Sequence, residues 1–266
     1  MIKLQKLIDF LEDSFPPYLA EDWDPIGLHF GSRGHQVEKI MVALDVRPSV
    51  VQEAIRQGVD TLIVHHPPLF KPIQRFDLDQ GFNRMYQAII KHDLNIYAMH
   101  TNCDIATGGM NDWLAQALDL ESIESLGGLT VEGEPKLGRI GLLPQPLSRS
   151  AVIQHIKSKL QLDQVTVIEQ SAKESYQSIA IIGGSGMSLL DQVVASSADI
   201  FITGDITFHD GQDAYEEDLM TIDAGHYIEH IFIDQMVDKL EEFLKENANT
   251  VQVLASQSST NPFTVE

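Results

Sequence analysis

Two adjacent histidines, His65 and His66, follow the apolar run 61–64 and precede a Pro-Pro pair. The run is typical of a buried strand, so both imidazoles are expected where that strand ends. Neutral imidazole nitrogens bind zinc, iron, nickel and copper. The pair therefore indicates a metal site. The alternative is one core histidine beside a solvent-exposed neighbour.

Histidines and carboxylates also stand at three further predicted strand ends. In parallel α/β sheets, ligands bind beyond the carboxyl ends of the strands, where the loops meet. A mixture of imidazoles and carboxylates suits two divalent ions, such as zinc, iron, manganese or nickel, bridged by a carboxylate. The additional candidate residues are His100, Asp104, Asp205, His209, His226, Glu229 and His230.

His226 and Glu229 are three positions apart at a predicted helix start, so both side chains can reach one ion. His230, four positions after His226, could take the place of Glu229. We favour Glu229 because an internal repeat, described below, aligns it with Asp104. The alternative for this segment is an exposed helix N-terminus at which Glu229 complements the helix dipole.

His209 and Asp205 are the candidates for proton transfer, and imidazole has the advantage of titrating near neutral pH. Both His100 and His209 could instead orient a metal ligand through a hydrogen bond, or be structural. The glycine-rich segment 183–186 lacks the lysine of a P-loop and predicts a tight turn, with nucleotide contact through its backbone as the alternative. Cys103 is expected to pack rather than to react.

The composition argues against several classes of partner. The chain has 266 residues, and its 18 basic and 39 acidic side chains give a formal net charge of −21. Such a charge repels nucleic-acid backbones and anionic lipid, so a small-molecule substrate is the expected partner. The first eleven residues have the apolar spacing of an amphipathic helix rather than of a signal peptide. The single cysteine and the absence of an apolar run long enough for a membrane span indicate a cytoplasmic protein.

Short apolar strands alternate with amphipathic helices along the chain, which predicts an α/β fold. One helix is expected to begin with Ser49 as its N-cap and to end at Gly58. The predicted strands cover 39–45, 61–64, 95–100, 139–143, 165–169, 178–184 and 199–205. Further helices are predicted over 82–91, 150–160, 189–195 and 231–245.

The two halves of the chain repeat one plan. Lys39 and Thr61, in the first two strands of the first half, are 22 positions apart, and so are Ser178 and Ile200 in the corresponding strands of the second half. Alignment at that offset pairs Asp60 with Asp199, and after one change of offset it pairs Asp104 with Glu229. We infer an internal duplication, although any two βαβ units share some likeness.

The duplication predicts two similar α/β halves. The first domain, 1–125, contains three of the candidate ligands, and the second domain, 126–266, contains two. The five residues are His65, His66 and Asp104 in the first domain and His226 and Glu229 in the second.

Seven segments occur in a characteristic order: 23–28, 42–45, 64–70, 100–104, 203–205 with His209, 223–226 and 261–263. In this order they resemble the Nif-three-like family, often described as GTP cyclohydrolase I type 2 homologues. The resemblance covers nearly the whole chain. The chain is similar to the short form of the family, which lacks an inserted middle domain. The resemblance implies a two-domain α/β fold with a dinuclear metal centre in the cleft between the two domains. The implied ligands are His65, His66, Asp104, His226 and Glu229, and the implied assembly is a homo-oligomer, a toroidal hexamer.

The function expected from these observations is that of a dinuclear metal-dependent hydrolase. Its substrate would be small and nucleotide-like or phosphorylated, and the link to GTP cyclohydrolase type 2 rests on resemblance alone. The alternative is a non-catalytic metal-binding protein, such as a metal carrier, a regulatory protein or a scaffold. An open coordination position would indicate the enzyme, whereas a site closed by protein ligands would indicate the alternative.

Overall fold

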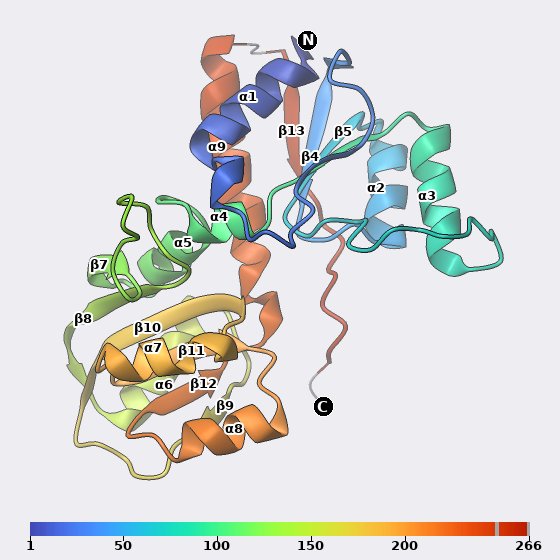
Figure 1. Ribbon diagram of the computed structural model, residues 1–266. Helices are drawn as coiled ribbons and strands as arrows, with labels where there is room; N and C mark the ends of the chain where they lie inside the picture. The colour runs from blue at the N-terminus through green and yellow to red at the C-terminus, as the bar shows by residue number, and fades with distance from the viewer. Residues whose placement is uncertain (248–249, 265–266) are drawn as a thin grey trace. The chain divides into compact units, whose positions relative to one another are not determined.

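The computed structural model describes residues 1–247 and 250–264. These residues form two compact units (Figure 1), and each is considered by itself. The first unit contains Met1–Cys103 and Phe232–Thr264, and the second contains Asp104–Ile231. These units differ from the predicted domains, 1–125 and 126–266. The difference arises because the C-terminal helix and strand return to pack with the N-terminal part of the chain.

The first unit is built on a five-stranded sheet with the order β13-β4-β5-β6-β2. Neighbouring strands pair in parallel, apart from β2, which pairs antiparallel to β6. The central strands are buried on both faces, which explains why their sequences are continuously apolar rather than alternating. Their bounds are β2 (Gly27–Phe30), β4 (Lys39–Ala43), β5 (Thr61–Val64), β6 (Asn95–Ala98) and β13 (Gln252–Ala255). Two short strands, β1 (Ile2–Lys3) and β3 (Gln36–Val37), form a separate ladder.

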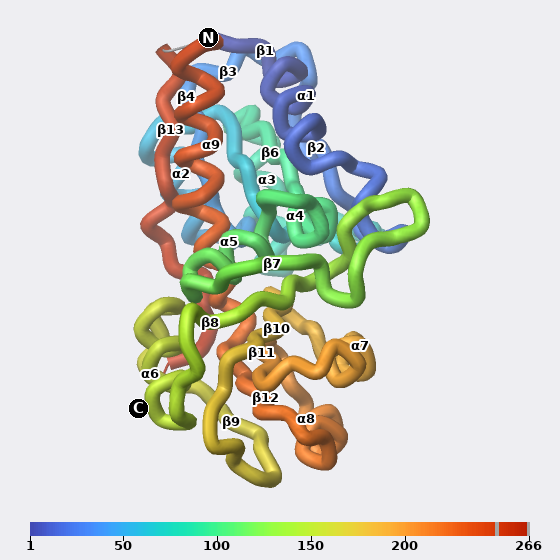
Figure 2. The backbone as a smooth tube through the Cα atoms, turned by 90° about the vertical axis from the view of Figure 1, so that its left-hand side faces the viewer, coloured from blue at the N-terminus to red at the C-terminus, as the bar shows by residue number. Residues whose placement is uncertain are grey.

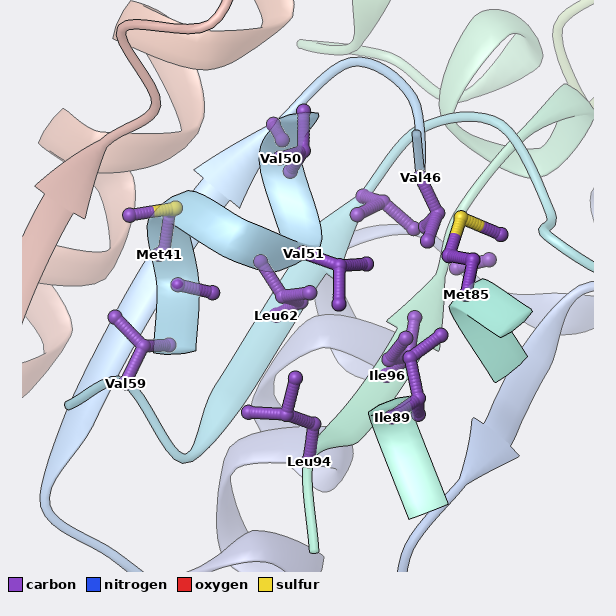
Figure 3. Packing of buried hydrophobic residues seen from close by; sticks show 14 of the residues in the cluster. Met41, Val46, Val50, Val51, Val59, Leu62, Met85, Ile89, Leu94 and Ile96 are labelled. Carbon is purple, nitrogen blue, oxygen red and sulfur yellow. The ribbon is translucent and has the colours of Figure 1, made fainter. Parts of the chain in front are cut away.

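Helices cover both faces of this sheet. On one face α1 (Leu4–Ser14) and α9 (Ile231–Asn247) lie side by side, and Phe10 stacks on Phe243 with ring centroids 4.0 Å apart (Figures 1 and 2). On the other face lie α2 (Pro48–Gln57) and α3 (Gly81–Lys91). Figure 3 shows Val51 of α2 and Ile89 of α3 meeting Leu62 and Ile96 of the strands. Burial of these apolar side chains holds the strand ends in fixed positions.

The ends of α2 test two of the sequence predictions. The helix begins at Pro48 with Arg47 at the N-cap, so Ser49 lies inside the first turn and the prediction that it caps the helix is wrong. Proline is favoured at the first helical position because its φ is already fixed and its missing N–H is not needed there. Gly58 ends the helix with φ of 65°, as predicted, since glycine adopts this left-handed conformation without strain.

The second unit is built on a six-stranded mixed sheet with the order β7-β8-β10-β11-β12-β9. Strands β10, β11 and β12 pair in parallel, and the pairings of β8 with β10, of β7 with β8 and of β9 with β12 are antiparallel. Figures 1 and 2 show α7 and α8 on one face of this sheet and α6 on the other. The strands are β7 (Glu121–Ser125), β8 (Arg139–Leu147), β9 (Thr166–Ile168), β10 (Tyr176–Ser185), β11 (Ile200–Gly204) and β12 (Met220–Asp223). The helices are α5 (Met110–Ala117), α6 (Arg149–Lys159), α7 (Leu190–Ala195) and α8 (Phe208–Tyr215).

Shorter helical segments complete the chain. A five-residue helix, α4 (Thr101–Ile105), spans the junction between the first and second units. Three 3-10 turns are η1 (Pro17–Leu19), η2 (Met187–Leu189) and η3 (His226–His230). In the described part of the chain, no helix is both long and apolar enough to cross a membrane.

The two units share a specific hydrogen-bonding scheme. Oδ2 of Asp60 accepts hydrogen bonds from the backbone N–H groups of residues 38 and 39, at 2.8 and 2.9 Å. Oδ2 of Asp199 accepts from residues 177 and 178, at 2.9 and 3.0 Å. Backbone bonds from Met99 to Val64 and from Ala224 to Thr203 also correspond. All of these pairs follow the two offsets found in the sequence.

Candidate metal centre

The first unit brings its candidate side chains to one edge of its sheet. Strands β4, β5 and β6 are parallel, so their carboxyl ends lie at the same edge. Asp45 comes just after β4, His65 and His66 come directly after β5, and His100 comes just after β6. The proline pair after His66 ends the extended run, because proline has no N–H to donate to a neighbouring strand.

The three imidazoles of this edge form a compact cluster. His65, His66 and His100 each offer a ring nitrogen, and these three atoms lie within 4.8 Å of one another. The ring of His65 is fully buried, with its centroid 4.7 Å from that of His66 and 5.2 Å from that of His100. Such a spacing of nitrogens could hold a metal ion.

An oxygen atom beside Nδ1 orients each of the three rings. Nδ1 of His65 donates to the carbonyl oxygen of Met99 at 2.9 Å. Nδ1 of His66 lies 2.9 Å from Oδ1 of Asp45, and Nδ1 of His100 lies 3.0 Å from Oδ1 of Asp24. Each contact leaves Nε2 as the nitrogen that can coordinate an ion. Metal-binding histidines are oriented in the same way in most proteins.

Asp24 and Asp45 remain ionised at neutral pH. Burial by itself would raise the pKa of the Asp24 carboxyl, but hydrogen bonds from His100 and Thr101 outweigh burial and hold this pKa below its ordinary value. Burial opposes ionisation of Asp45 too, and hydrogen bonds from His66 and Thr260 lower its pKa. Both carboxylates therefore act as acceptors for the imidazole N–H groups.

The second unit brings two carboxylates and one imidazole together. The carboxylates of Asp104 and Glu229 offer oxygens within 4.8 Å of one another, and both residues are buried. Nε2 of His226 lies 3.1 Å from Oε2 of Glu229. On the other side of its ring, Nδ1 of His226 lies 2.7 Å from Oδ2 of Asp205. His226 thus shows the same orientation as the imidazoles of the first unit.

Glycines at the ends of β10 and β11 make room for these side chains. A Cβ atom on Gly184, whose φ is +64°, would lie 2.7 Å from Oε1 of Glu229. A Cβ on Gly204 would lie 2.6 Å from the backbone nitrogen of His226. The prediction of a tight turn over 183–186 is wrong for most of the segment, because residues 183–185 are the end of β10, where the pairing with β11 shifts register, and η2 begins only after Gly186.

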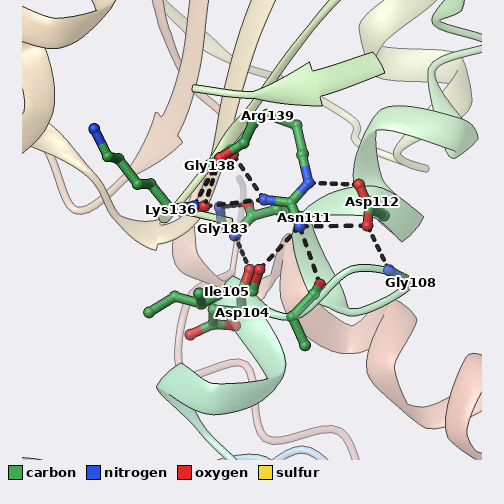
Figure 4. A network of polar contacts seen from close by, with 11 residues as sticks. Asp104, Ile105, Gly108, Asn111, Asp112, Lys136, Gly138, Arg139 and Gly183 are labelled. Carbon is green, nitrogen blue, oxygen red and sulfur yellow. Dashed lines mark hydrogen bonds and ion pairs between the residues drawn. The ribbon is translucent and has the colours of Figure 1, made fainter. Parts of the chain in front are cut away.

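A buried polar network supports the segment that carries Asp104 (Figure 4). The amide of Asn111 donates to the carbonyl oxygen of Asp104 at 2.9 Å and accepts from the backbone N–H of Gly183 at 2.9 Å. The guanidinium of Arg139, only 3% exposed, pairs with Asp112 and donates to the carbonyls of residues 105 and 106. The network therefore ties the backbone beside Asp104 to the strand that packs against Glu229.

The structure separates the other sequence candidates. Glu229 lies beside His226, whereas Nδ1 of His230 contacts the carbonyl oxygen of Tyr227 at 2.8 Å. Asp205 holds His226, which gives this carboxylate an orienting contact in addition to its predicted part in proton transfer. His209 is exposed on α8 and contacts Gln212. Its role in proton transfer stays a prediction.

An open cavity of about 580 Å³ lies beside α8 in the second unit. Ile168 of β9, Asp223 of β12 and Phe208 and Tyr215 of α8 contribute to its lining. His209, although it belongs to the same helix, does not contribute to the lining.

Asp24 and Asp45 were not among the site residues predicted from the sequence. Asp24 belongs to the motif at 23–28 and Asp45 to the motif at 42–45, and Asp45 is the last residue of a predicted strand, so the sequence did contain a signal. Their partners could not be identified because the contact to His66 or His100 spans 21 or 76 positions of the chain.

Comparison with known proteins identifies the family to which this chain belongs. The family model described as Duf34/NIF3 (NGG1p interacting factor 3) matches residues 2–262. The chain belongs to the DUF34/NIF3 family. A relative in this family, the GTP cyclohydrolase 1 type 2 homolog of Streptococcus pneumoniae, is 36% identical over 261 residues, which are 97% of each chain.

The fold agrees with solved structures of the DUF34/NIF3 family. A Bacillus cereus protein related to NIF3 superimposes with a TM-score of 0.91 at 25% identity, covering 99% of each chain. The Bacillus subtilis homolog aligns over 365 positions, which exceeds the 266 residues of this chain although 98% of each protein is covered. The present chain is therefore a short form of the family, as the resemblance implied.

Proposed function

We propose that this chain is a hydrolase that depends on two divalent metal ions and acts on a small, nucleotide-like or phosphorylated substrate. One observation carries the proposal. In each of His65, His66, His100 and His226 an oxygen acceptor engages Nδ1, so that Nε2 is presented for coordination. Histidines that only fill a core do not require this shared orientation.

The donor set fits a pair of divalent ions. The proposed ligands are His65, His66, Asp104, His226 and Glu229, and zinc, iron, manganese and nickel all accept such a mixture of nitrogen and oxygen atoms. The first unit supplies imidazoles, whereas the second supplies both carboxylates. A carboxylate is the side chain that can bridge two ions, so we propose that both units contribute to one dinuclear centre.

When bound, the ions would supply the Lewis acidity that hydrolysis at neutral pH requires. The protein's own residues would position the reactants and accept a proton. His100, oriented by the ionised Asp24, is placed to accept a proton at Nε2 if it is not a ligand, and His209 and Asp205 are the other proton-transfer candidates. Asp205 would in addition hold His226 in place.

We further infer that the two units arose by internal duplication. Support comes from the equivalent hydrogen bonds made by Asp60 and Asp199, which occur at the offset found in the sequence. Similar folds alone would not require the same side chain to accept from the same two backbone positions.

We also propose a homo-oligomer, a hexamer by resemblance to the family, that works in the cytoplasm on a small molecule. The net charge of −21 supports this choice of partner over nucleic acid, because the protein's field repels polyanions. Light scattering of the purified protein would measure the assembly.

Elemental analysis and substrate assays test the proposed function. Protein purified without chelator or affinity metal should contain about two metal ions per chain and hydrolyse members of a panel of nucleotides and phosphoesters. Chelation should abolish turnover, and the divalent ion should restore it. The variant His66→Ala should lose metal and activity, whereas His92→Ala, at an exposed position after α3, should lose neither.

Two results would contradict parts of this proposal. Folded protein that contains no metal and binds none on addition would exclude the dinuclear centre. Stoichiometric metal without turnover of any substrate would favour the alternative, a non-catalytic metal-binding, regulatory or scaffold protein.

A further inference from the structure

Two large aromatic side chains of the first unit are exposed beside the imidazole cluster. Trp23 is 59% exposed and Phe70 is 49% exposed, and their ring centroids lie 5.8 Å apart. Trp23 lies in the motif at 23–28, and Phe70 follows the two histidines and the proline pair. Two adjacent aromatic rings that stay exposed to water forgo the favourable free energy of burial, so such a pair indicates a ligand-binding surface.

Both rings contact His100 edge-on. The centroid of His100 lies 6.0 Å from that of Trp23 and 6.1 Å from that of Phe70. His100 in turn offers a nitrogen within 4.8 Å of those of His65 and His66. The aromatic pair is therefore continuous with the residues proposed to bind metal.

The backbone holds both aromatic residues in place. The residue after Trp23 is Asp24, whose buried carboxylate accepts hydrogen bonds from the backbone N–H and the hydroxyl of Thr101 and contacts His100. Near Phe70, the carbonyl oxygen of Pro68 accepts a hydrogen bond from the hydroxyl of Tyr86 at 2.8 Å. The exposed rings are thus attached to ordered segments, which lowers the entropic cost of binding a ligand.

We propose that Trp23 and Phe70 form a stacking platform for a planar nitrogen heterocycle such as a nucleobase. Because the two rings are tilted by 48° to each other, one stacks on the face of the heterocycle and the other contacts its edge. This inference rests on the proposed function, and it narrows the substrate class to molecules that carry such a ring. Aromatic faces bind heterocycles by stacking, whereas they offer no hydrogen-bond donor to a phosphate group. A phosphorylated sugar without a ring system would not use the platform.

Guanosine tests the platform, because it has the heterocycle and no phosphate. Calorimetric titration of the full chain should give saturable binding, and ribose 5-phosphate should not compete with it. Trp23→Ala and Phe70→Ala should weaken guanosine binding by about five- to 150-fold each. Both positions are exposed, so these variants should remain folded, and circular dichroism will verify this.

Phe76→Ala is the matched control. Phe76 lies in the same loop and is 48% exposed, but its ring contacts Tyr86 instead of His100. The Phe76→Ala variant should bind guanosine with the same affinity as the unmodified protein. Tryptophan fluorescence locates the ligand. Guanosine should quench the fluorescence of the unmodified protein. Trp23→Phe should lose this quenching and retain most of the affinity for guanosine.

The same preparations separate the two proposals. Metal present without guanosine binding would overturn the platform and leave the proposed function intact. Guanosine binding that requires Trp23 in a protein that binds no metal would support the platform and contradict the proposed function. Equal affinities of Phe70→Ala and Phe76→Ala for guanosine would also overturn the platform. So would equal affinities of the unmodified protein for ribose 5-phosphate and for guanosine.

Discussion

Asp60 and Asp199 make the same pair of hydrogen bonds in the two units. Each carboxylate accepts from two consecutive backbone N–H groups near the start of a strand, β4 in the first unit and β10 in the second. Because the acceptor is a charged group, each aspartate anchors the N-terminal end of that strand.

Replacement of either aspartate by alanine should therefore destabilise the protein. We expect Asp60→Ala and Asp199→Ala each to lower the free energy of unfolding by about 1.5–3 kcal/mol, the usual contribution of hydrogen bonds to a charged group. Urea denaturation measures this change. Asp79→Ala, whose side chain is 95% exposed, is the control and should change the free energy by no more than about 0.5 kcal/mol. No change in either variant would show that the shared contacts do not stabilise the strands.

Asp199 also predicts a dependence of stability on pH. Burial would raise the pKa of its carboxyl, but the N–H groups of Gln177 and Ser178 and the ammonium of Lys173 hold it below the ordinary value of 3.8. Its stabilising contribution is thus fully present above the unfolded pKa and is lost as the pH falls through the folded pKa. Denaturation at a series of pH values below about 5 should show that acid lowers the free energy of unfolding less in Asp199→Asn than in the unmodified protein. An identical acid profile in both proteins would contradict this assignment.

The carboxylates behind the imidazoles should tune the affinity for metal. Asp45→Asn and Asp205→Asn replace the ionised acceptors of His66 and His226, so each should weaken metal binding by about 10- to 100-fold. Competition with a chromophoric chelator measures the affinity. Asp213→Asn, at an exposed position on α8, should bind metal normally. Unchanged affinity in Asp45→Asn would indicate that His66 is not a ligand oriented by this carboxylate.

Gly184 should be required for the position of Glu229. In Gly184→Ala the new Cβ would lie 2.7 Å from Oε1 of Glu229, in addition to the strain of an alanine at φ of +64°. Gly58→Ala is a matched control, because Gly58 has φ of +65° and nothing within 4 Å of its Cβ position. Both should lose about 1–2 kcal/mol of stability from backbone strain. Only Gly184→Ala should also lose metal affinity, as measured by calorimetry.

Asn111 should support the site through its backbone contacts. Asn111→Ala leaves the Asp104 carbonyl and the Gly183 N–H without this partner, which should cost about 1–3 kcal/mol for each buried group and weaken metal binding. The control is Asn83→Ala, which removes a buried asparagine of α3 that donates to the carbonyls of residues 75 and 77. It should lose stability and keep its metal affinity. If both variants keep their metal affinity, Asn111 is structural only.

The sequence by itself determined the α/β class, several of the strands and helices, and most of the candidate site residues. Apolar runs predicted β5 at its observed bounds and α9 nearly so, because these elements bury long continuous or helically spaced apolar faces. The edge strand β2 and the terminal strand β13 were not predicted, since four-residue edge segments that are only partly buried carry a weak pattern. The candidate site residues at the strand ends could also be identified from the sequence, because histidines and carboxylates stand there directly after apolar runs.

Only the tertiary structure decided which groups meet. The return of α9 and β13 to the first unit depends on pairing between β13 and β4, more than 200 positions apart, and no local pattern encodes such a contact. The same holds for Asp24 beside His100 and for Asp205 beside His226. These contacts depend on strand pairing, which is antiparallel between β2 and β6 in the first case and parallel between β11 and β12 in the second. Local propensity acts over a few residues, whereas the orientation of a metal ligand depends on packing between segments distant in the chain.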